Sequence, residues 1–348
     1  MFFRVSSEAG GIPVGGKSLF SIRAGRIRVV HWAHRLIRAL LIVSQLLTFG
    51  YMSLSIIIAT QVAYTQPKPI TRTPAALGLS FQDVAFPSRE DHVLLRGWFI
   101  PGVLSNGQMT VQRAIIMVHG MHSNRAAEEL GLLDLSAALA RHGFAILAFD
   151  MRGHGESSPA PLSAGYFEQR DVLGAVDFLR SSSPPYPELG RPRVIGGWGV
   201  SMGGATMLLA AAREPAIRAV VADCAYAAIV PLLERGSGVP PIFIPSVLAS
   251  FRILYGIDYY AVRPIDVVAR LAPRPIFFIQ GTADTVVPPW NMQELATAAS
   301  KAHGAHVQTW LVPGAQHVQS YHVMGFEYIK RVVTFLTAAL GSDTHVTR

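Results

Sequence analysis

Cysteine and charged residues are both scarce in this chain of 348 residues. The single cysteine, Cys224, excludes an internal disulfide, and its apolar surroundings predict a small buried residue. Only 15% of the residues are charged, whereas 50% are hydrophobic, which leaves ample material for a core and indicates a membrane segment. No internal repeat is visible along the chain.

The net charge of +8 is unevenly distributed, because most of it lies in residues 1–38. The basic residues of that segment, set against Glu8 alone, are Arg4, Lys17, Arg23, Arg26, Arg28, Arg35 and Arg38. The remainder of the chain is nearly neutral, so the sequence gives no indication of nucleic-acid binding.

Residues 39–66 contain no Asp, Glu, Lys or Arg, and the stretch exceeds the about 20 residues that a helix needs to cross a bilayer. We therefore expect a transmembrane helix there. A cleaved signal peptide is the alternative, although its apolar region would span only about 7–15 residues. The basic residues before the span, against Lys68 and Arg72 after it, predict that residues 1–38 stay in the cytoplasm and that the rest is exported.

Residues 11–18 (GIPVGGKS) match the Walker A pattern letter for letter. A phosphate-binding loop requires a buried strand before it and a long helix after it, so that backbone amides converge on the phosphates. A polar segment precedes this match, and a short basic stretch leads from it to the predicted membrane helix. We expect no nucleotide binding here, and we predict no cofactor.

Residues 67–78 are rich in proline and read as a linker, and residues 79–348 read as one domain in which strands alternate with helices. The expected strands are residues 83–86, 93–100, 114–118, 144–149, 193–196, 219–222, 275–279 and 306–312. The expected helices are residues 125–141, 166–180, 205–212 and 321–340. This alternation predicts an α/β fold with a mostly parallel central sheet covered by helices on both faces. Residues 225–262 are long enough to form a small helical cap.

Residues 197–204 (GWGVSMGG) contain the pattern of a nucleophile elbow, with Ser201 between Gly199 and Gly203. A serine on a sharp turn from strand to helix has a strained backbone and close neighbours, and glycines two residues away provide the space. The N-terminus of the following helix directs backbone N–H groups at any oxyanion formed there. A glycine-rich loop with a capping serine fits the same letters, so the assignment depends on partners elsewhere.

A nucleophilic serine requires a base, and the base requires a carboxylate to orient it. In a parallel sheet these groups belong on loops at the carboxyl ends of strands. Asp284 follows the strand over residues 275–279 and His317 follows the strand over residues 306–312, which gives the order expected of such a triad. Asp223, directly after an earlier strand, is the alternative for the acid.

His119 to His122 follow the strand over residues 114–118, where a backbone N–H is expected to face the serine. We expect the amides of Met121 and Met202 to form an oxyanion hole, and His119 to organise its loop. His154 lies between glycines in the tight loop over residues 150–157, and we interpret it as structural.

The segments VHGMHSNR, FDMRGHGES, GWGVSMGG, GTADTVVPP and VPGAQHV, in that order, resemble the α/β-hydrolase superfamily. Within it they are most similar to bacterial serine-aminopeptidase-like and prolyl-oligopeptidase-like hydrolases, many of which are membrane-anchored. The resemblance covers residues 79–340. One departure is HGMH in place of the HGGG of many lipases.

The sequence thus predicts a serine hydrolase that cleaves a carboxylic ester through an acyl-enzyme, without a metal ion. A serine peptidase or amidase of the same fold is the alternative, and a catalytically inactive membrane-tethered binding protein is an alternative of another class. The expected substrate is a small-molecule ester, a lipid or a peptide, and the expected second partner is the lipid bilayer, through residues 39–66. The expected location is a bacterial inner membrane, crossed once, with the hydrolase domain outside the cytoplasm.

Overall fold

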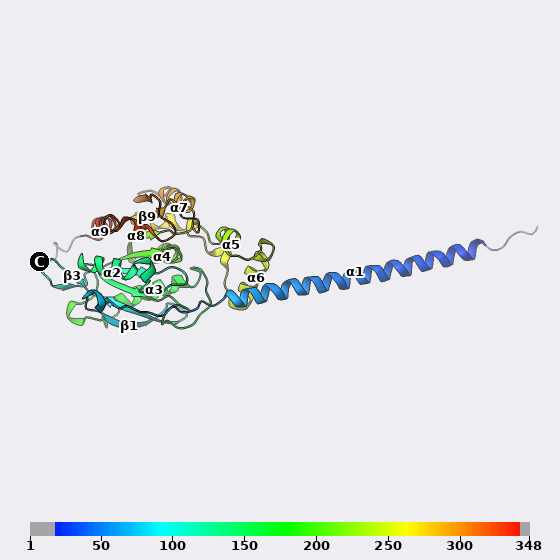
Figure 1. Cartoon of the computed structure of the whole chain (residues 1–348), viewed down its shortest axis with the longest axis horizontal. Coiled ribbons are helices and arrows are strands. Elements are labelled where there is room, and N and C mark those ends of the chain that lie inside the picture. Colours follow the sequence, from blue (N-terminus) through cyan, green and yellow to red (C-terminus); the bar gives the residue numbers. More distant parts are fainter. Residues whose placement is uncertain (1–17, 342–348) are drawn as a thin grey trace, which may run out of the picture. The chain divides into compact units, whose positions relative to one another are not determined.

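The computed structural model describes residues 18–341, with side chains from His31 onward (Figure 1). The chain divides into two compact units, Met1–Ser55 and Ile56–Arg348. Residues 1–17, which include most of the Walker-like segment together with Arg4 and Lys17, lie outside the described residues.

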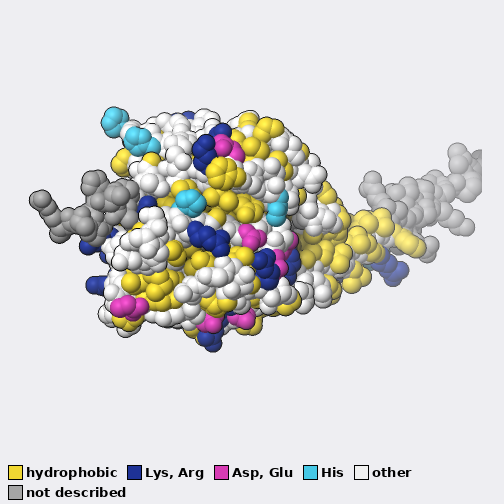
Figure 2. Space-filling model, turned by 60° about the vertical axis from the view of Figure 1, so that its left-hand side comes forward, with side chains coloured by type: hydrophobic (Ala, Val, Ile, Leu, Met, Phe, Trp, Pro, Cys, Tyr) yellow, Lys and Arg dark blue, Asp and Glu magenta, His cyan; other side chains and the backbone are white. Residues whose placement is uncertain are grey.

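A single long helix, α1 (Ser18–Val62), occupies the N-terminal part of the described chain. Its segment His31–Val62 is long and apolar enough to cross a membrane, a test that a signal sequence also passes. Large apolar side chains along this segment are exposed, among them Leu40, Leu47 and Phe49. Figure 2 shows hydrophobic side chains, in yellow, along the part of the chain that extends from the domain. Exposed apolar surface of this length is costly in water, which favours an apolar surrounding.

The hydrolase-like part contains an eight-stranded sheet in the order β1-β2-β6-β5-β7-β8-β9-β10. Its strands are β1 (Gln82–Pro87), β2 (Leu94–Ile100), β5 (Arg113–Val118), β6 (Ala145–Phe149), β7 (Val194–Val200), β8 (Ile217–Asp223), β9 (Ile276–Gly281) and β10 (Val307–Val312). The pairs β1–β2 and β2–β6 are antiparallel, and the other neighbours are parallel. The predicted mostly parallel sheet is therefore confirmed.

Helices cover both faces of this sheet, as predicted. The longer ones are α2 (Leu132–Arg141), α3 (Glu168–Arg180), α4 (Met202–Arg213), α7 (Trp290–Ser300) and α9 (Phe326–Leu340). Helices α3, α4 and α7 pack on one hydrophobic core, and α2 and α9 pack on a second core across the sheet. The inner strands β5 and β6 are buried at every residue, because both of their faces are covered.

Several predicted elements differ from the observed ones. The helix expected over residues 125–141 starts only at Leu132, after a 3-10 turn at Glu128–Leu130, because Arg125 is held by Asp150. The helix expected over residues 321–340 is split into α8 (Ser320–Met324) and α9 by Gly325, whose φ is 44°. Helix α7 and the small hairpin of β3 (Gly102–Val103) and β4 (Met109–Thr110) were not predicted.

The segment that follows α1 is bound to the body of the domain, so it is not the free linker that its proline content indicates. Helix α1 ends at Val62, four residues before the predicted end of the span. The carbonyl of Ala63 accepts a hydrogen bond from the Leu162 amide at 2.7 Å, and Thr65 donates one to the carbonyl of Gly153. Further along, the side-chain amide of Asn124 donates to the carbonyls of Lys68 and Pro69, both at 3.2 Å, and residues 74–77 form a 3-10 turn.

The predicted cap contains short helices joined by turns. They are α5 (Val230–Gly236), a 3-10 turn at Pro241–Phe243, α6 (Ile244–Tyr255) and a 3-10 turn at Tyr259–Ala261. The hydroxyls of Tyr226 and Tyr259 donate to the carbonyls of Ala164 and Leu162, at 2.6 Å and 2.7 Å. These bonds tie both ends of the cap to the loop that precedes α3.

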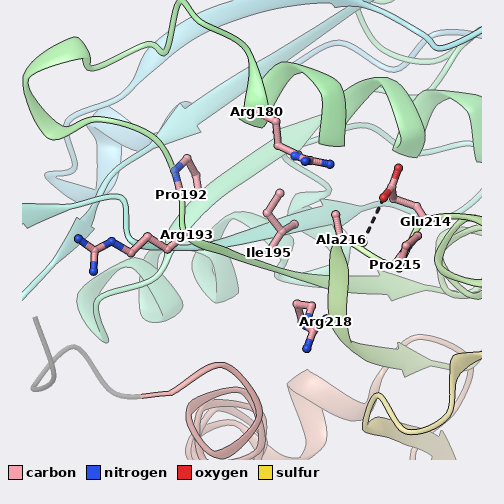
Figure 3. Close-up of a pocket in the computed structure, with 8 residues that line it drawn as sticks. All are labelled: Arg180, Pro192, Arg193, Ile195, Glu214, Pro215, Ala216 and Arg218. Atoms are coloured by element: carbon pink, nitrogen blue, oxygen red, sulfur yellow. Dashed lines mark hydrogen bonds between the residues drawn. The ribbon is translucent and has the colours of Figure 1, made fainter.

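The amino ends of β7 and β8 border a hollow of about 390 Å³ (Figure 3). Its lining comes from the end of α3, the start of β7 and the turn from α4 into β8, and includes Arg180, Arg193, Glu214 and Arg218. Glu214 accepts a hydrogen bond from the Ala216 amide at 3.1 Å, so one of its oxygens is used within the turn. This edge lies opposite the loops that carry the predicted catalytic residues.

Candidate active site

The predicted catalytic residues all follow carboxyl ends of parallel strands. Ser201 comes directly after β7, whereas Asp284 and His317 follow the neighbouring strands β9 and β10. Strand β5, which leads into the predicted oxyanion segment, pairs with β7 so that Val118 lies opposite Gly199. Parallel pairing therefore brings segments far apart in sequence to one edge of the sheet.

Ser201 occupies a strained turn between β7 and α4. Its φ of 54° and ψ of −121° are unfavourable for a residue with a side chain, and its amide donates to the carbonyl of Asp223 at 2.8 Å. A Cβ at Gly199 would lie 2.4 Å from the carbonyl oxygen of Gly203, and one at Gly203 would lie 2.3 Å from that of Val118. Only glycine fits at both positions, so the sequence pattern follows from close backbone packing.

Ser201, His317 and Asp284 form a continuous chain of hydrogen bonds. The Oγ of Ser201 lies 3.0 Å from Nε2 of His317, and Nδ1 of His317 lies 2.8 Å from Oδ2 of Asp284. Because the carboxylate only accepts, Nδ1 carries the proton and Nε2 is left to accept the proton of the serine. The side chain of His317 is 20% exposed and that of Asp284 is fully buried, so the ring can be reached from outside while its partner is shielded.

Asp284 receives more hydrogen bonds than the one from His317. The amides of Val286 and Val287 donate to its Oδ1 at 3.0 Å and 2.8 Å, and the side-chain amide of Gln280 donates to its Oδ2 at 2.9 Å. Together with the bond to His317, these hydrogen bonds hold the side chain of Asp284 in one position, which fixes one orientation of the imidazole ring.

Asp223, the alternative acid, has other partners. The hydroxyl of Tyr328 donates to its Oδ2 at 2.9 Å, while the thiol of Cys224 and the hydroxyl of Ser320 donate to its Oδ1 at 3.0 Å and 3.4 Å. Burial raises the pKa of Asp223 to about 6, although these donors and the nearby His317 lower it. The geometry therefore favours Asp284 as the partner of His317.

The segment after β5 approaches the serine closely. A methyl group added at Gly120 would lie 3.5 Å from Cβ of Ser201, so the backbone that leads to Met121 runs beside the nucleophile. Met202 is the first residue of α4, where backbone N–H groups point out of the helix. The structure thus brings the chain segments of both predicted oxyanion donors next to Ser201.

Two histidines hold this segment against the loop after β6. His119 is fully buried; its Nδ1 donates to the carbonyl of Gly120 at 2.7 Å and its Nε2 accepts the amide of Met151 at 3.0 Å. His154 donates from Nδ1 to the carbonyl of Arg152 at 2.9 Å and accepts the amide of His122 at Nε2, at 3.3 Å. As the sequence predicts, both rings organise loops.

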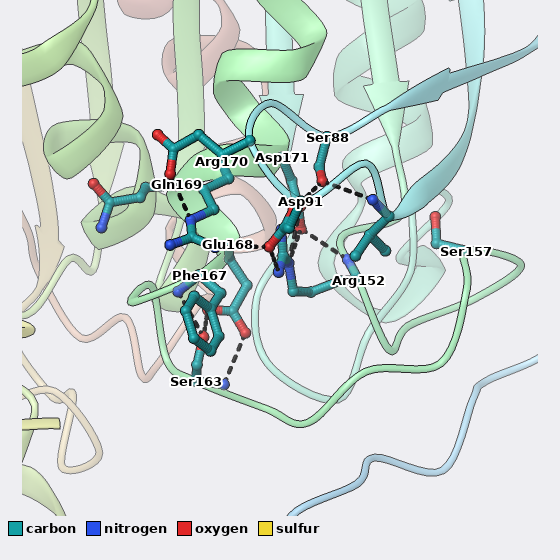
Figure 4. Close-up of polar contacts among 12 residues, drawn as sticks. Ser88, Asp91, Arg152, Ser157, Ser163, Phe167, Glu168, Gln169, Arg170 and Asp171 are labelled. Carbon is teal, nitrogen blue, oxygen red and sulfur yellow. Dashed lines mark hydrogen bonds and ion pairs between the residues drawn. The ribbon is translucent and has the colours of Figure 1, made fainter. Parts of the chain in front are cut away.

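The loop after β6 is in turn fixed by a buried ion cluster (Figure 4). Arg152, which is 3% exposed, pairs with Asp171 of α3 and with Asp91 of the turn between β1 and β2, both at 2.7 Å. Arg170 bonds the same carboxylate of Asp91 at 2.9 Å. These contacts join three distant segments and give the loop that carries His154 a rigid support.

Sequence reasoning missed two contributors to the site. Gln280 comes directly after the expected strand over residues 275–279 and received no role, yet its side-chain amide bonds both Asp284 and the carbonyl of Val287. A glutamine inside a run that is otherwise apolar was the available signal. No signal in the sequence indicates the bond between His122 and His154, because the pairing of β5 with β6 is what brings the two residues together.

Cys224 is buried, as predicted, and lies close to the catalytic pair. One ligand atom from each of Cys224, Asp284 and His317 lies within 4.8 Å of the others. Burial and then Asp223 raise the pKa of the Cys224 thiol well above its usual value, so it stays protonated. Since Asp284 and His317 already bond each other, we assign no metal ion to this group.

Comparisons with known proteins agree with this architecture. Residues 113–240 match the family model described as the alpha/beta hydrolase fold. The protein YfhR of Escherichia coli K12 is 27% identical over 264 residues, which cover 75% of this chain and 82% of that protein.

Two solved archaeal structures are also similar. The esterase Pf2001 of Pyrococcus furiosus superposes with a TM-score of 0.65 at 26% identity, covering 80% of this chain and 100% of the esterase. The acylaminoacyl peptidase of Pyrococcus horikoshii superposes with a TM-score of 0.57 at 15% identity, covering 82% of this chain and 48% of the peptidase, which is a likeness of fold alone.

Proposed function

We propose that this chain, which has the α/β-hydrolase fold, is a membrane-anchored serine hydrolase that cleaves a carboxylic ester. The observation that carries the proposal is the chain of hydrogen bonds from Ser201 through His317 to Asp284, at 3.0 Å and 2.8 Å. The likeness to the Pyrococcus furiosus esterase supports an ester, rather than an amide, as the proposed substrate.

In the proposed reaction, Nε2 of His317 takes the proton of Ser201 as Oγ attacks the carbonyl carbon of the ester. The C=O π electrons move onto the carbonyl oxygen, and the tetrahedral intermediate collapses as His317 gives its proton to the leaving alcohol. The acyl group is then bound to Ser201. Water, deprotonated by His317, attacks this acyl-enzyme. The second tetrahedral intermediate then collapses, which breaks the bond to Oγ and releases the acid, while His317 returns its proton to Oγ of Ser201. Asp284 stabilises the imidazolium that forms in each half of the reaction.

The oxyanion formed in both halves is proposed to accept hydrogen bonds from the amides of Met121 and Met202. Two features support this assignment: the close approach of Gly120 to Ser201 and the position of Met202 at the N-terminus of α4. Loss of one fixed N–H donor of this kind typically costs about 2.7–4 kcal/mol of transition-state stabilisation. The methionine side chains have no part in this function.

We further propose that α1 anchors the enzyme, with the N-terminus in the cytoplasm and the hydrolase domain outside. The length and composition of residues 31–62 support the anchor. Two reporters, each fused after Leu340, test the orientation. We expect the alkaline phosphatase fusion to be active and the green fluorescent protein fusion to be non-fluorescent. The opposite pair would reverse the orientation, and recovery of a soluble domain that lacks its N-terminus would replace the anchor with a cleaved signal.

Hydrolysis by the full chain of p-nitrophenyl esters of graded acyl length, alongside aminoacyl-naphthylamides, tests the activity. We expect the esters to be cleaved faster. Ser201→Ala and His317→Ala should each lower kcat by about 10⁴–10⁶, because members of a triad act as one unit. A variant that retains more than about a tenth of wild-type activity would remove that residue from the mechanism. Faster cleavage of the naphthylamides would turn the assignment to a peptidase.

A further inference from the structure

Helix α6 of the cap is apolar on more than its packed side. Its inward face carries Val247, Leu248 and Phe251, all buried. Its last turn nevertheless exposes Ile253 at 77% and Leu254 at 46%. A surface helix of a domain in water normally shows charged and polar residues on its outer side. The same turn also exposes Arg252, whose side chain is 72% exposed and lies 3.4 Å from the carboxylate of Asp258. Large apolar side chains beside an arginine suit a surface at the boundary between water and an apolar phase.

Two tyrosines extend this surface beyond α6. Tyr260, in the 3-10 turn after α6, is 54% exposed, and Tyr64, just after α1, is 52% exposed. We call Ile253, Leu254, Tyr260 and Tyr64 the cap apolar face. Tyrosine is enriched where a membrane meets water, because its ring is apolar and its hydroxyl remains hydrated.

The cap apolar face adjoins the end of α1. The ring of Tyr255, at the end of α6, packs edge-on against the ring of Tyr64, with centroids 6.2 Å apart. Ala63 is fully buried and bonded to Leu162, whose own carbonyl accepts the hydroxyl of Tyr259. The residues directly after α1 are thus joined to the cap by side-chain and backbone contacts.

The predicted span and the cap are only a few residues apart along the chain. The segment His31–Val62 is about 48 Å long at 1.5 Å per residue, which exceeds the about 30 Å thickness of the hydrocarbon core. Tyr64, whose ring contacts the cap, follows this segment by two residues. A cap joined to the chain so soon after a spanning helix is within reach of the interfacial layer.

The same stretch of chain also contacts the candidate active site. Lys68 follows Val62 by six residues, which span at most about 20 Å even when fully extended. The side-chain amide of Asn124 bonds the carbonyl of Lys68, and burial and then the charge of Lys68 lower the pKa of His122, one residue after Met121. The segment that borders Ser201 is therefore held by residues that follow the predicted span closely in the sequence.

From these contacts we infer that the cap apolar face inserts into the membrane interface and that the enzyme takes a membrane-dissolved acyl ester as its substrate. The inference rests on the proposed function for both the anchor and the nucleophile. Insertion places the cap where a lipophilic ester is concentrated, so the substrate reaches Ser201 without first entering bulk water.

The position of the face is tested with a fluorescent label. Ile253→Cys is labelled with an environment-sensitive nitrobenzoxadiazole group in the full chain, reconstituted in phosphatidylcholine–phosphatidylglycerol vesicles. Native Cys224 is buried, and the unsubstituted protein serves as the control for labelling. Phe326→Cys is the matched control, since Phe326 is 79% exposed at the start of α9. For the label at position 253 we expect a blue-shifted emission and quenching by doxyl lipids. For the label at position 326 we expect neither change. A water-like signal at both positions would overturn the inference.

The substrate class is tested by comparing two esters. Ile253→Ser with Leu254→Ser should lower hydrolysis of a long-chain acyl ester dissolved in the vesicles by about tenfold, equal to about 1.4 kcal/mol. The same double variant should hydrolyse water-soluble p-nitrophenyl butyrate at a rate within about twofold of the unsubstituted enzyme. The control variant Phe326→Ser should stay within about twofold on both esters. Equal losses on both esters would contradict the inference. If the unsubstituted enzyme cleaves neither ester, the proposed hydrolase function fails, while the label still reports on the face.

Discussion

The two edges of the sheet differ in how closely the backbone is packed. At the carboxyl edge, a Cβ on Gly199 or Gly203 would meet a carbonyl oxygen at 2.4 Å or 2.3 Å, and Ser201 is held at a positive φ. At the amino edge, Arg193 and Arg218 line an open hollow (Figure 3). The comparison teaches that a hollow alone does not mark chemistry; strained backbone with converging polar groups is the stronger sign.

The largest effect expected at the carboxyl edge, beyond loss of the serine or histidine, comes from the acid. Asp284→Asn should lower kcat by about 10⁴, because the ring of His317 loses the partner that fixes its tautomer. Asp223→Asn should cost less than about tenfold, since Asp223 bonds Tyr328, Ser320 and Cys224 instead of His317. Steady-state kinetics on one p-nitrophenyl ester measures both. The reverse ranking would transfer the acid role to Asp223.

The close packing itself is tested by one added methyl group. Gly199→Ala should lower kcat by about 100-fold, because the added methyl group would press on the carbonyl of Gly203 and displace Ser201 from the position that the reaction requires. Gly236→Ala, at the end of α5, is the control, since a Cβ there has no heavy atom within 4 Å. Its activity should stay within about twofold. Similar activity in the two variants would show that the elbow has more space than described.

A smaller effect is expected from pH, through the histidine behind the oxyanion segment. Burial and then the neighbouring His154 lower the pKa of His119 from 6.5 to about 3. Below pH 6.5 the unfolded chain therefore binds a proton that the folded chain does not, and stability falls by up to about 1.4 kcal/mol for each pH unit. Buried carboxyls with raised pKa values, Asp171 at about 7 and Asp223 at about 6, act in the opposite direction.

Comparison with His119→Gln isolates this contribution, because both carboxyls remain in the variant. We expect the free energy of unfolding in urea to fall more steeply between pH 6.5 and pH 5 in the wild type than in His119→Gln. The difference should approach about 1.4 kcal/mol for each pH unit. Parallel curves would mean that His119 titrates normally in the folded protein.

The smallest effect is expected at the amino edge. Arg193→Ala and Arg218→Ala remove side chains that line the hollow, so ester hydrolysis should remain within about twofold of the wild type. The same kinetic assay measures it. A tenfold loss in either variant would place a functional site at this edge and end the contrast between the two.

The sequence was sufficient for the alternation of strands and helices and for the order of the catalytic motifs, because both depend on local patterns. Helix α7 was missed because its buried residues, Asn291, Met292, Leu295 and Ala299, give a weak apolar stripe. The late start of α2 has a tertiary cause, since Asp150 binds the backbone and side chain of Arg125.

The predicted site residues could be chosen because each follows a strand, but the supports around them could not. The contact of Lys68 with Asn124 turns a predicted linker into a docked segment, and it joins residues 56 positions apart. The bond from His122 to His154 likewise depends on which strands pair. Such contacts arise from the assembled sheet and leave no regular spacing in the sequence.

Covalent labelling of Ser201 tests the central proposal most directly. The full chain in detergent is treated with a fluorophosphonate probe, and the modified residue is identified by peptide mass spectrometry. We expect one phosphonylated residue, Ser201, with labelling lost in Ser201→Ala and strongly slowed in His317→Ala. Absence of labelling in the intact protein, or undiminished labelling of Ser201→Ala, would contradict a serine nucleophile at this elbow and favour a binding protein on a hydrolase scaffold.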